Sequence, residues 1–442
     1  MRTARPVESR LPEILEGISA PRTPDYLDDI LGQVGRTRQR PRWTFPERWL
    51  PMTALSERVA TAPRIPMRMA VVLALLLLAL AVSIVLIAGS QRPSVPAPFG
   101  VAGNGEVVFA DQTGAIVAGN VSDGTTKVIV SGSGHSRPVF SPDGRSLAYL
   151  QRQGSGRTDI VVSDPNGASP QLLNPNAVTG IGHFGWTPDS RSVVAVIGGD
   201  IFAFDPTATA EPTLLLHVPS GLDYLDTFNN NLSDIFRPPN GDDILFIGTG
   251  PRGAGLYRMR LVGADPIAVV TDQTIDSTWS SNQSGAQWSP DGTRIVLTIH
   301  PAATPQFGYA YVVNADGTDL RRLTKYEVSG AVVDEEHASW SPDGTRIALA
   351  RWIMYDDGNI DPRPVVIVDV ATGHEVEASN REVNGYNGWS WSPDGSMILE
   401  VPGDGSDDAA KGMQVDAGTG QARELGWTSP NAASWQRTVP RN

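Results

Sequence analysis

The chain has 442 residues, contains no cysteine and carries a formal net charge of −13. Without cysteine it can form neither disulfides nor thiolate metal sites, and a cysteine nucleophile is excluded. Residues 1–68 hold 12 arginines and 8 acidic residues, whereas the remainder holds 23 basic and 40 acidic side chains. Because the acidic remainder has no basic stripe, we expect no nucleic-acid partner.

Residues 1–66 are expected to form a short cytosolic segment that is partly helical or disordered. Apolar residues recur at helical spacing in 11–18 and in 26–34, and Thr23 with Pro24 suits the start of the second helix. Two helices of this size are too small to bury a core by themselves. We therefore expect residues 11–35 either to dock a cytosolic partner or to remain a partly ordered tail.

Twenty uncharged and mostly apolar residues at 69–88 predict a single transmembrane helix over 67–89. At about 1.5 Å per residue such a helix spans roughly 30 Å, the thickness of the hydrocarbon core of a bilayer. A buried helix of a soluble protein would be expected to show a polar stripe. A cleaved signal peptide would lie nearer the N-terminus.

The charges that flank this run predict its orientation. Eight arginines lie in residues 36–68, whereas Arg92 is the only basic residue between 89 and 120. The positive-inside rule therefore places the N-terminus in the cytoplasm of a bacterial cell and the rest of the chain outside. The proline-rich stretch 90–100 is expected to be a semi-rigid linker.

Residues 101–442 are organised by a repeated turn. The turn SPDG occurs at 141–144, 289–292, 341–344 and 392–395, and weaker copies are TPDS at 187–190 and PPNG at 238–241. The turn prolines follow one another at intervals of 46, 51, 51, 52 and 51 residues. This spacing, with 45 glycines and 35 prolines available for tight turns, is typical of four-stranded propeller blades. The sequence therefore predicts an all-β fold, a β-propeller.

The two ends of this region supply one further blade. Residues 106–110, 115–121 and 126–130 have the pattern of three strands that lack an innermost partner, and residues 433–437 have the pattern of a strand without a blade. Pairing of the two fragments would close the ring and leave no open sheet edge. We predict seven four-stranded blades, with a six-bladed ring as the alternative.

The SPDG turns preceded by Trp288, Trp340 and Trp391, and the hairpin ADGTDLRRLT at 315–324, resemble the PD40 or WD40-like repeats of TolB-type propellers. The resemblance implies a propeller over 101–442 but no single activity, because these repeats occur in binding proteins, peptidases and other enzymes. TolB itself has six blades behind a separate α/β domain. Its role and partner are therefore not carried over to a chain with a predicted seventh blade. The recurring tryptophans are interpreted as packing residues.

No motif in the sequence indicates catalysis or a cofactor. The hydrolase pentapeptide G-x-S-x-G, the Walker motif and the dinucleotide glycine motif do not occur as strand-to-helix turns. Asp357, Asn359 and Asp361 have the spacing of a calcium loop, but Pro362 replaces the required glycine and Val368 the final glutamate. We predict no enzyme activity, no cofactor and no metal site.

Two histidines occupy equivalent positions in different repeats. His183 and His337 each lie five residues before a turn proline, at the entrance to an innermost strand and near one mouth of the central tunnel. The connections that enter these strands also carry acidic residues: Asp223, Asp226, Asp234, Asp276, Asp334, Glu335 and Glu336. Such a mouth suits a cation or a basic peptide, although a solvated acidic rim is the simpler interpretation. The candidate ligand-binding residues are His183, His337, Asp234, Asp334, Glu335 and Glu336.

Together these features predict a membrane-tethered extracytoplasmic propeller that binds a protein or peptide partner or serves as a scaffold. The alternative is a transmembrane sensor that relays ligand binding to the cytosolic segment. An enzyme at the tunnel mouth has the least support.

Overall fold

The computed structural model describes most of the predicted propeller. The described ranges are 100–154, 156–173, 180–207, 211–223, 235–238, 241–261, 265–279, 285–378, 388–401, 411–427 and 433–439. The predicted cytosolic segment, transmembrane helix and linker up to residue 99 lie outside them and stay predictions. Within the described ranges, no helix has the length and apolar character needed to cross a membrane.

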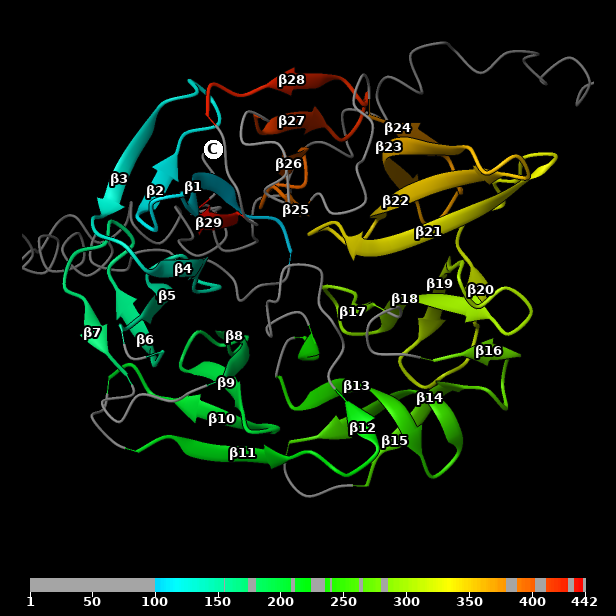
Figure 1. Cartoon of the computed structure of the whole chain (residues 1–442), viewed down its shortest axis with the longest axis horizontal. Helices are drawn as coiled ribbons and strands as arrows, with labels where there is room; N and C mark the ends of the chain where they lie inside the picture. Colours follow the sequence, from blue (N-terminus) through cyan, green and yellow to red (C-terminus); the bar gives the residue numbers. More distant parts are fainter. Residues whose placement is uncertain are drawn as a thin grey trace, which may run out of the picture. The chain divides into compact units, whose positions relative to one another are not determined.

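Seven antiparallel sheets form a ring (Figure 1), so the prediction of seven blades is confirmed and the six-bladed alternative is wrong. We number the blades along the chain. In sheet order, blade 1 is β29 (Ser434–Thr438), β1 (Gly103–Ala110), β2 (Ile116–Gly119) and β3 (Thr126–Val130). Blade 2 is β4 (His135–Phe140), β5 (Leu147–Arg152), β6 (Thr158–Ser163) and β7 (Gln171–Leu172). Blade 3 is β8 (Ile181–Trp186), β9 (Val193–Ile197), β10 (Asp200–Phe204) and β11 (Thr213–His217).

The remaining blades follow the same order. Blade 4 is β12 (Leu222–Asp223), β13 (Asp243–Gly250), β14 (Gly253–Arg260) and β15 (Ile267–Thr271). In blade 5, β16 (Ser277–Thr278) and β17 (Ala286–Trp288) both pair with β18 (Arg294–Pro301), which is followed by β19 (Tyr309–Asn314) and β20 (Arg321–Arg322). Blade 6 is β21 (Ala331–Trp340), β22 (Arg346–Tyr355), β23 (Ile360–Asp369) and β24 (Glu375–Glu377). Blade 7 is β25 (Gly388–Trp391), β26 (Met397–Val401), β27 (Met413–Asp416) and β28 (Ala422–Glu424).

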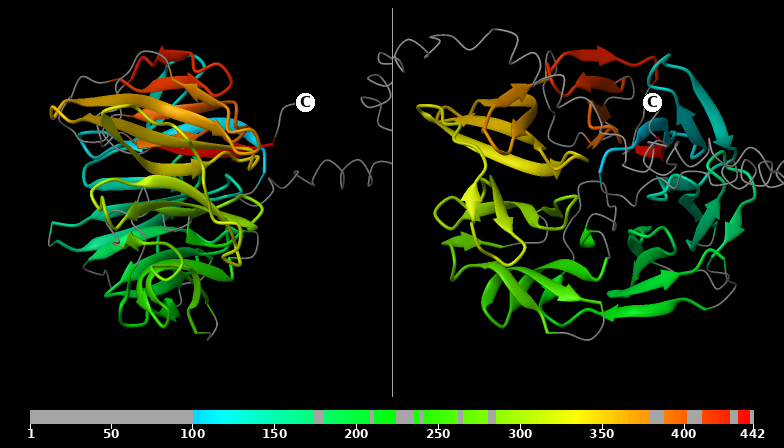
Figure 2. Two further views of the ribbon diagram at one scale, coloured as in Figure 1. Left: turned by 90° about the vertical axis from the view of Figure 1, so that its right-hand side faces the viewer. Right: turned by 180° about the vertical axis from the view of Figure 1, so that it is seen from behind.

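The strand near the C-terminus closes the ring by completing blade 1, as predicted. β29 runs antiparallel to β1, with Val107 opposite Trp435 and Val108 opposite Ser434. The same strand also holds blade 2, because the Ser434 hydroxyl accepts a hydrogen bond from the Phe140 amide at 3.1 Å. This pairing gives the inner edge of β1 a partner, and Figure 2 shows the red C-terminal strand beside the blue β1 from behind.

Each SPDG turn is held by its own side chains. In the turn at 289–292, the Ser289 hydroxyl donates to the Asp291 carboxylate at 2.6 Å, and Gly292 adopts a left-handed φ of 67°. The Thr293 amide donates to the same carboxylate at 3.0 Å. Glycine is required here because its missing Cβ would lie 2.2 Å from the Pro238 carbonyl oxygen of the preceding blade. The turn therefore also serves as a packing surface between blades.

The hydrophobic core lies between neighbouring sheets. One cluster, for example, joins Val296 and Val312 of blade 5 to Trp340, Ile347 and Val366 of blade 6. No blade could bury both of its faces alone, so the ring is stabilised by contacts between successive repeats.

Three arginines add polar contacts to this packing. The guanidinium carbon lies 5.3, 4.7 or 5.4 Å from the centroid of a tryptophan ring of the next blade in the pairs Arg237–Trp288, Arg294–Trp340 and Arg346–Trp391. Each arginine also donates to the carbonyl oxygen of the glycine in the following turn. We call these the Arg–Trp contacts; they join blades 4, 5, 6 and 7 in series. The prediction that the tryptophans are packing residues is confirmed.

Candidate functional site

The equivalence of His183 and His337 is confirmed by the strand register. The innermost strands of blades 2, 3 and 6 each contain a register shift, between Ser136 and Val139, between Ile181 and Phe184, and between Glu336 and Ser339. The residue five positions before the turn proline falls inside each shift: Arg137, His183 and His337. Bulges of this kind redirect side chains and are frequent near functional sites. Arg137 is not among the residues predicted from the sequence, although the count to the turn proline identifies it.

Two of these three side chains contact the next blade. The exposed Arg137 donates through Nη1 to the carbonyl oxygen of Gly182 in blade 3. His337 lies edge-on to Trp389 of blade 7, with 6.3 Å between ring centroids. Arg137 and His337 adopt φ values of 50° and 58°, which are uncommon for residues with a side chain. The bulge position therefore combines an unusual backbone with a side chain that spans two blades.

The two histidines do not form one cluster. His183 belongs to blade 3 and His337 to blade 6, and blades 4 and 5 lie between them in the ring. Figure 1 shows β8 and β21 on different sides of the centre. The sequence could establish equivalent positions but not proximity, because equivalent residues of a ring are dispersed around its axis.

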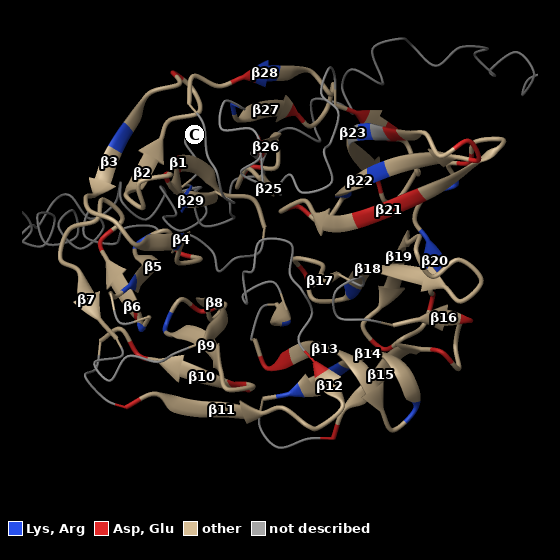
Figure 3. Cartoon of the chain, viewed as in Figure 1, with Lys and Arg blue, Asp and Glu red and all other residues tan. Residues whose placement is uncertain are grey.

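Carboxylates gather beside His337 on β21, where Figure 3 shows a continuous acidic stretch. Asp334 is buried and accepts a hydrogen bond from the Gly308 amide at 2.6 Å. Burial, with the negative charge of Glu336 as the next cause, raises the pKa of Asp334 to about 7. Burial also raises the pKa of Glu336.

His337 lies 3.7 Å from the Glu336 carboxylate, between Nε2 and Oε2. Burial lowers the pKa of His337 to about 4, so the imidazole is neutral at pH 7. This stretch of β21 therefore combines a neutral imidazole with a local excess of carboxyl groups.

Glu335 is engaged within the protein. Its fully buried carboxylate accepts a hydrogen bond from the Thr324 hydroxyl at 2.6 Å and one from Arg351 Nη2 at 2.9 Å. Arg351 also donates to Glu375 at 2.7 Å and lies 4.1 Å above the ring of Tyr326. Thr324 and Tyr326 follow β20 of blade 5, whereas the charged residues belong to blade 6. The network is therefore a joint between two blades.

The other predicted acidic residues are dispersed. Asp223 ends β12 and Asp276 precedes β16, and both are exposed. Asp234, like Asp226, lies outside the described residues. Across the described part of the chain, no three His, Cys, Asp or Glu side chains are arranged to hold a metal ion.

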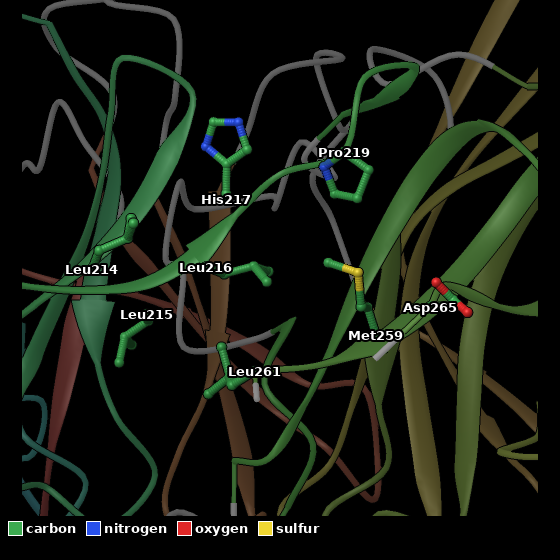
Figure 4. Close-up of a pocket in the computed structure, with 8 residues that line it drawn as sticks. All are labelled: Leu214, Leu215, Leu216, His217, Pro219, Met259, Leu261 and Asp265. Atoms are coloured by element: carbon green, nitrogen blue, oxygen red, sulfur yellow. The ribbon is translucent and has the colours of Figure 1, made fainter. Parts of the chain in front are cut away.

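A separate pocket of about 600 Å³ lies between blades 3 and 4 (Figure 4). It is lined by residues of β11, by the end of β14 and by the segments that follow each: Leu214, Leu215, Leu216, His217, Pro219, Met259, Leu261 and Asp265. No motif in the sequence predicts this pocket. Its only local signal is the run of three leucines at 214–216 in an outer strand.

Comparison with solved structures agrees with the propeller fold. An oligogalacturonate lyase in complex with manganese is 16% identical, with 74% of this chain and 85% of the lyase covered and a TM-score of 0.51. TolB from Acinetobacter baumannii is 16% identical, with coverages of 76% and 68% and a TM-score of 0.39. The propeller domain of the Trilobed protease from Pyrococcus furiosus is 15% identical, with coverages of 74% and 98% and a TM-score of 0.47.

At such low identity these likenesses concern the fold alone. No protein-family model matches the sequence, and no curated protein matches it. The SPDG turns and the closed ring of seven four-stranded blades nevertheless define the fold. The described part of the chain is a seven-bladed β-propeller.

Proposed function

We propose that the chain is a membrane-tethered, non-enzymatic binding module whose propeller faces the extracytoplasmic space and binds a protein or peptide with basic side chains. The tether is supported by the uncharged run at 69–88 and the arginines that precede it. The binding role is supported by the bulged inner strand of blade 6.

The observation that carries the proposal is the excess of carboxyl groups on β21. Asp334, Glu335 and Glu336 are consecutive, and Arg351 balances Glu335 together with Glu375. Among the described residues, neither Asp334 nor Glu336 forms an ion pair with a lysine or arginine, and burial raises the pKa of both. A lysine or arginine side chain of a partner beside the partly exposed Glu336 would stabilise the charged form of both carboxyl groups.

Binding of synthetic peptides to the full chain in lipid nanodiscs tests this role. An arginine- and lysine-containing peptide is expected to bind more tightly than its glutamate counterpart, and Glu336→Gln is expected to weaken that binding roughly ten-fold. Glu377→Gln is the matched control, because Glu377 is an exposed carboxylate on β24 of the same blade. Equal affinity of wild type and Glu336→Gln would contradict a site on β21.

The tether is tested separately by extraction of membranes at alkaline pH. The full chain should remain in the membrane pellet, and a variant that lacks residues 67–89 should be released. Release of both proteins would contradict the tether without bearing on the peptide site.

A further inference from the structure

The outermost strands of the propeller differ in character around the ring. In blades 1 to 4 each outer strand carries an exposed large apolar residue: Val128 (59% exposed), Leu172 (45%), Leu214 (50%) and Ile267 (44%). In blades 5 to 7 the outer strands are short and charged, with sequences RR, EVE and ARE. Charged residues on an edge strand discourage pairing with another chain. The outer strands of blades 2 to 4 carry no lysine, arginine or carboxylate and lack this protection, whereas β3 of blade 1 carries Lys127.

Among the outer strands, β11 has the sequence and position best suited to pairing with a strand from another chain. It reads Thr-Leu-Leu-Leu-His and pairs with β10, and it is the last strand in the sheet order of blade 3. Leu215 and Leu216 are half-buried against the core, whereas Leu214 is half-exposed. The strand is therefore firmly held on one side, and its other edge lies on the outside of the ring (Figure 1).

The pocket beside β11 supplies room for side chains. Leu216 and Met259 point toward one another across it, and Leu261 lies below them (Figure 4). Its charged lining residue is the exposed carboxylate of Asp265. At the other end, His217 is held by Asp200 through Nδ1 at 2.8 Å. A pocket of about 600 Å³ accommodates one or two large side chains.

We propose that an extended segment of another protein, with apolar residues next to a basic one, adds to blade 3 as a fifth strand along β11. Its main chain pairs with the free edge of β11, its apolar side chains enter the pocket, and its basic side chain pairs with Asp265. This is recognition by strand addition, in which main-chain hydrogen bonds give affinity and pockets select alternate side chains.

Charge favours this occupant over a second copy of the chain. Residues 213–219 contain no lysine or arginine, so a second β11 lying along the first would bring no cation to Asp265. The surface lies on the outside of blade 3, whereas the acidic site lies on the inner strand of blade 6. The proposed strand-addition surface and the proposed acidic site can therefore be confirmed or contradicted independently of each other.

Fluorescence anisotropy with the full chain tests strand addition. The probe is a fluorescein-labelled peptide, Thr-Val-Lys-Val-Thr-Val, and its counterpart carries glutamate in place of lysine. The lysine peptide is expected to bind at least about ten-fold more tightly, and Asp265→Lys is expected to invert this preference. Methylation of the peptide's backbone nitrogens on the pairing side should abolish binding, because it removes the main-chain donors.

Leu214→Ser should weaken binding of the lysine peptide roughly ten-fold. Leu172→Ser, a change at the equivalent exposed leucine of blade 2, should not weaken it. Unchanged melting temperatures establish that both variants fold. Undiminished affinity for the methylated peptide or in Leu214→Ser would overturn the proposal. A concentration-dependent dimer in sedimentation that Leu214→Ser disperses would also overturn it, in favour of a second copy at β11.

Discussion

Blades 5 to 7 and blades 1 to 3 are built from the same repeat but are joined in different ways. The fifth residue after the start of the turn is Arg294 in blade 5 and Arg346 in blade 6, and each makes an Arg–Trp contact with the next blade. At the same position blades 2 and 3 have Ser146 and Ser192. Blades 2 and 3 therefore lack an Arg–Trp contact, although the Trp186 indole still donates to the Val139 carbonyl at 3.2 Å, as the Trp391 indole does to the Ser339 carbonyl at 3.3 Å.

The outer edges differ in the same sense. Blades 5 to 7, which Arg–Trp contacts join, have charged outer strands, whereas the outer strands of blades 1 to 4 each expose an apolar residue. Blade 4 has both features, because Arg237 joins it to blade 5 and its outer strand exposes Ile267. We therefore expect blades 5 to 7 to contribute more than blades 1 to 3 to the stability of the ring, and the outer strands of blades 2 to 4 to be the edges open to a partner.

The largest effect of a substitution on stability is expected at the joint between blades 5 and 6. Arg351→Ala leaves the buried Glu335 carboxylate without its cation and should reduce the free energy of unfolding by about 3–5 kcal/mol. Urea denaturation of the full chain measures the loss. The control, Arg191→Ala, removes a largely exposed guanidinium and should change stability by less than about 0.5 kcal/mol.

A double variant distinguishes an isolated charge from lost packing. Arg351→Met with Glu335→Leu removes both charges and keeps apolar volume, so it should recover much of the stability that Arg351→Ala loses. If the double variant is as unstable as the single one, the network contributes through other contacts, such as that with Tyr326.

A smaller effect is expected for the Arg–Trp contacts themselves. Arg294→Ala removes a contact with the Trp340 ring and a hydrogen bond to the Gly344 carbonyl, so it should cost about 1–2 kcal/mol. Ser146→Ala, at the same repeat position in blade 2, should cost less than about 0.5 kcal/mol. Equal losses would show that the two halves do not differ in the way they are joined.

Much of this architecture could be predicted because its signals are local. The SPDG turn and the alternation of apolar residues repeat within about 50 residues, and the two unpaired fragments at the ends predicted closure by β29. The site could be predicted only in part. Counting to the turn proline predicted the equivalence of His183 and His337, although both lie within their strands and not at the entrance. The local register does not show that blades 4 and 5 separate them.

The joint around Arg351 and the pocket beside β11 could not be predicted, for a different reason. Glu335, Arg351 and Glu375 lie on three strands of blade 6, and Thr324 and Tyr326 come from blade 5. The pocket likewise depends on how two blades pack side by side. Such partners are fixed by packing between repeats, whereas the sequence signals describe one repeat at a time.

The smallest effect concerns pH and the acidic stretch of β21. Burial raises the pKa of Asp334 to about 7, so between about pH 4 and 7 the folded state binds the proton more strongly than the unfolded state. Stability therefore falls as pH rises through that range. Burial lowers the pKa of His337 to about 4, so between about pH 4 and 6.5 stability rises with pH through this residue. The two contributions oppose each other over most of the range.

Substitution of Asp334 should reveal the opposing contribution of His337 to the pH dependence of stability. Asp334→Asn removes the contribution to stability that decreases as pH rises. The melting temperature of this variant should therefore rise more steeply from pH 4.5 to 6.5 than that of wild type. Asp319→Asn, a change at an exposed aspartate of blade 5, should leave the pH profile of wild type unchanged. Because Glu336 and His300 also face Asp334, a parallel shift of the whole Asp334→Asn profile without a change of slope would mean that its carboxyl group does not titrate in this range. Blade 6 would then owe its pH response in this range to His337 and Glu336.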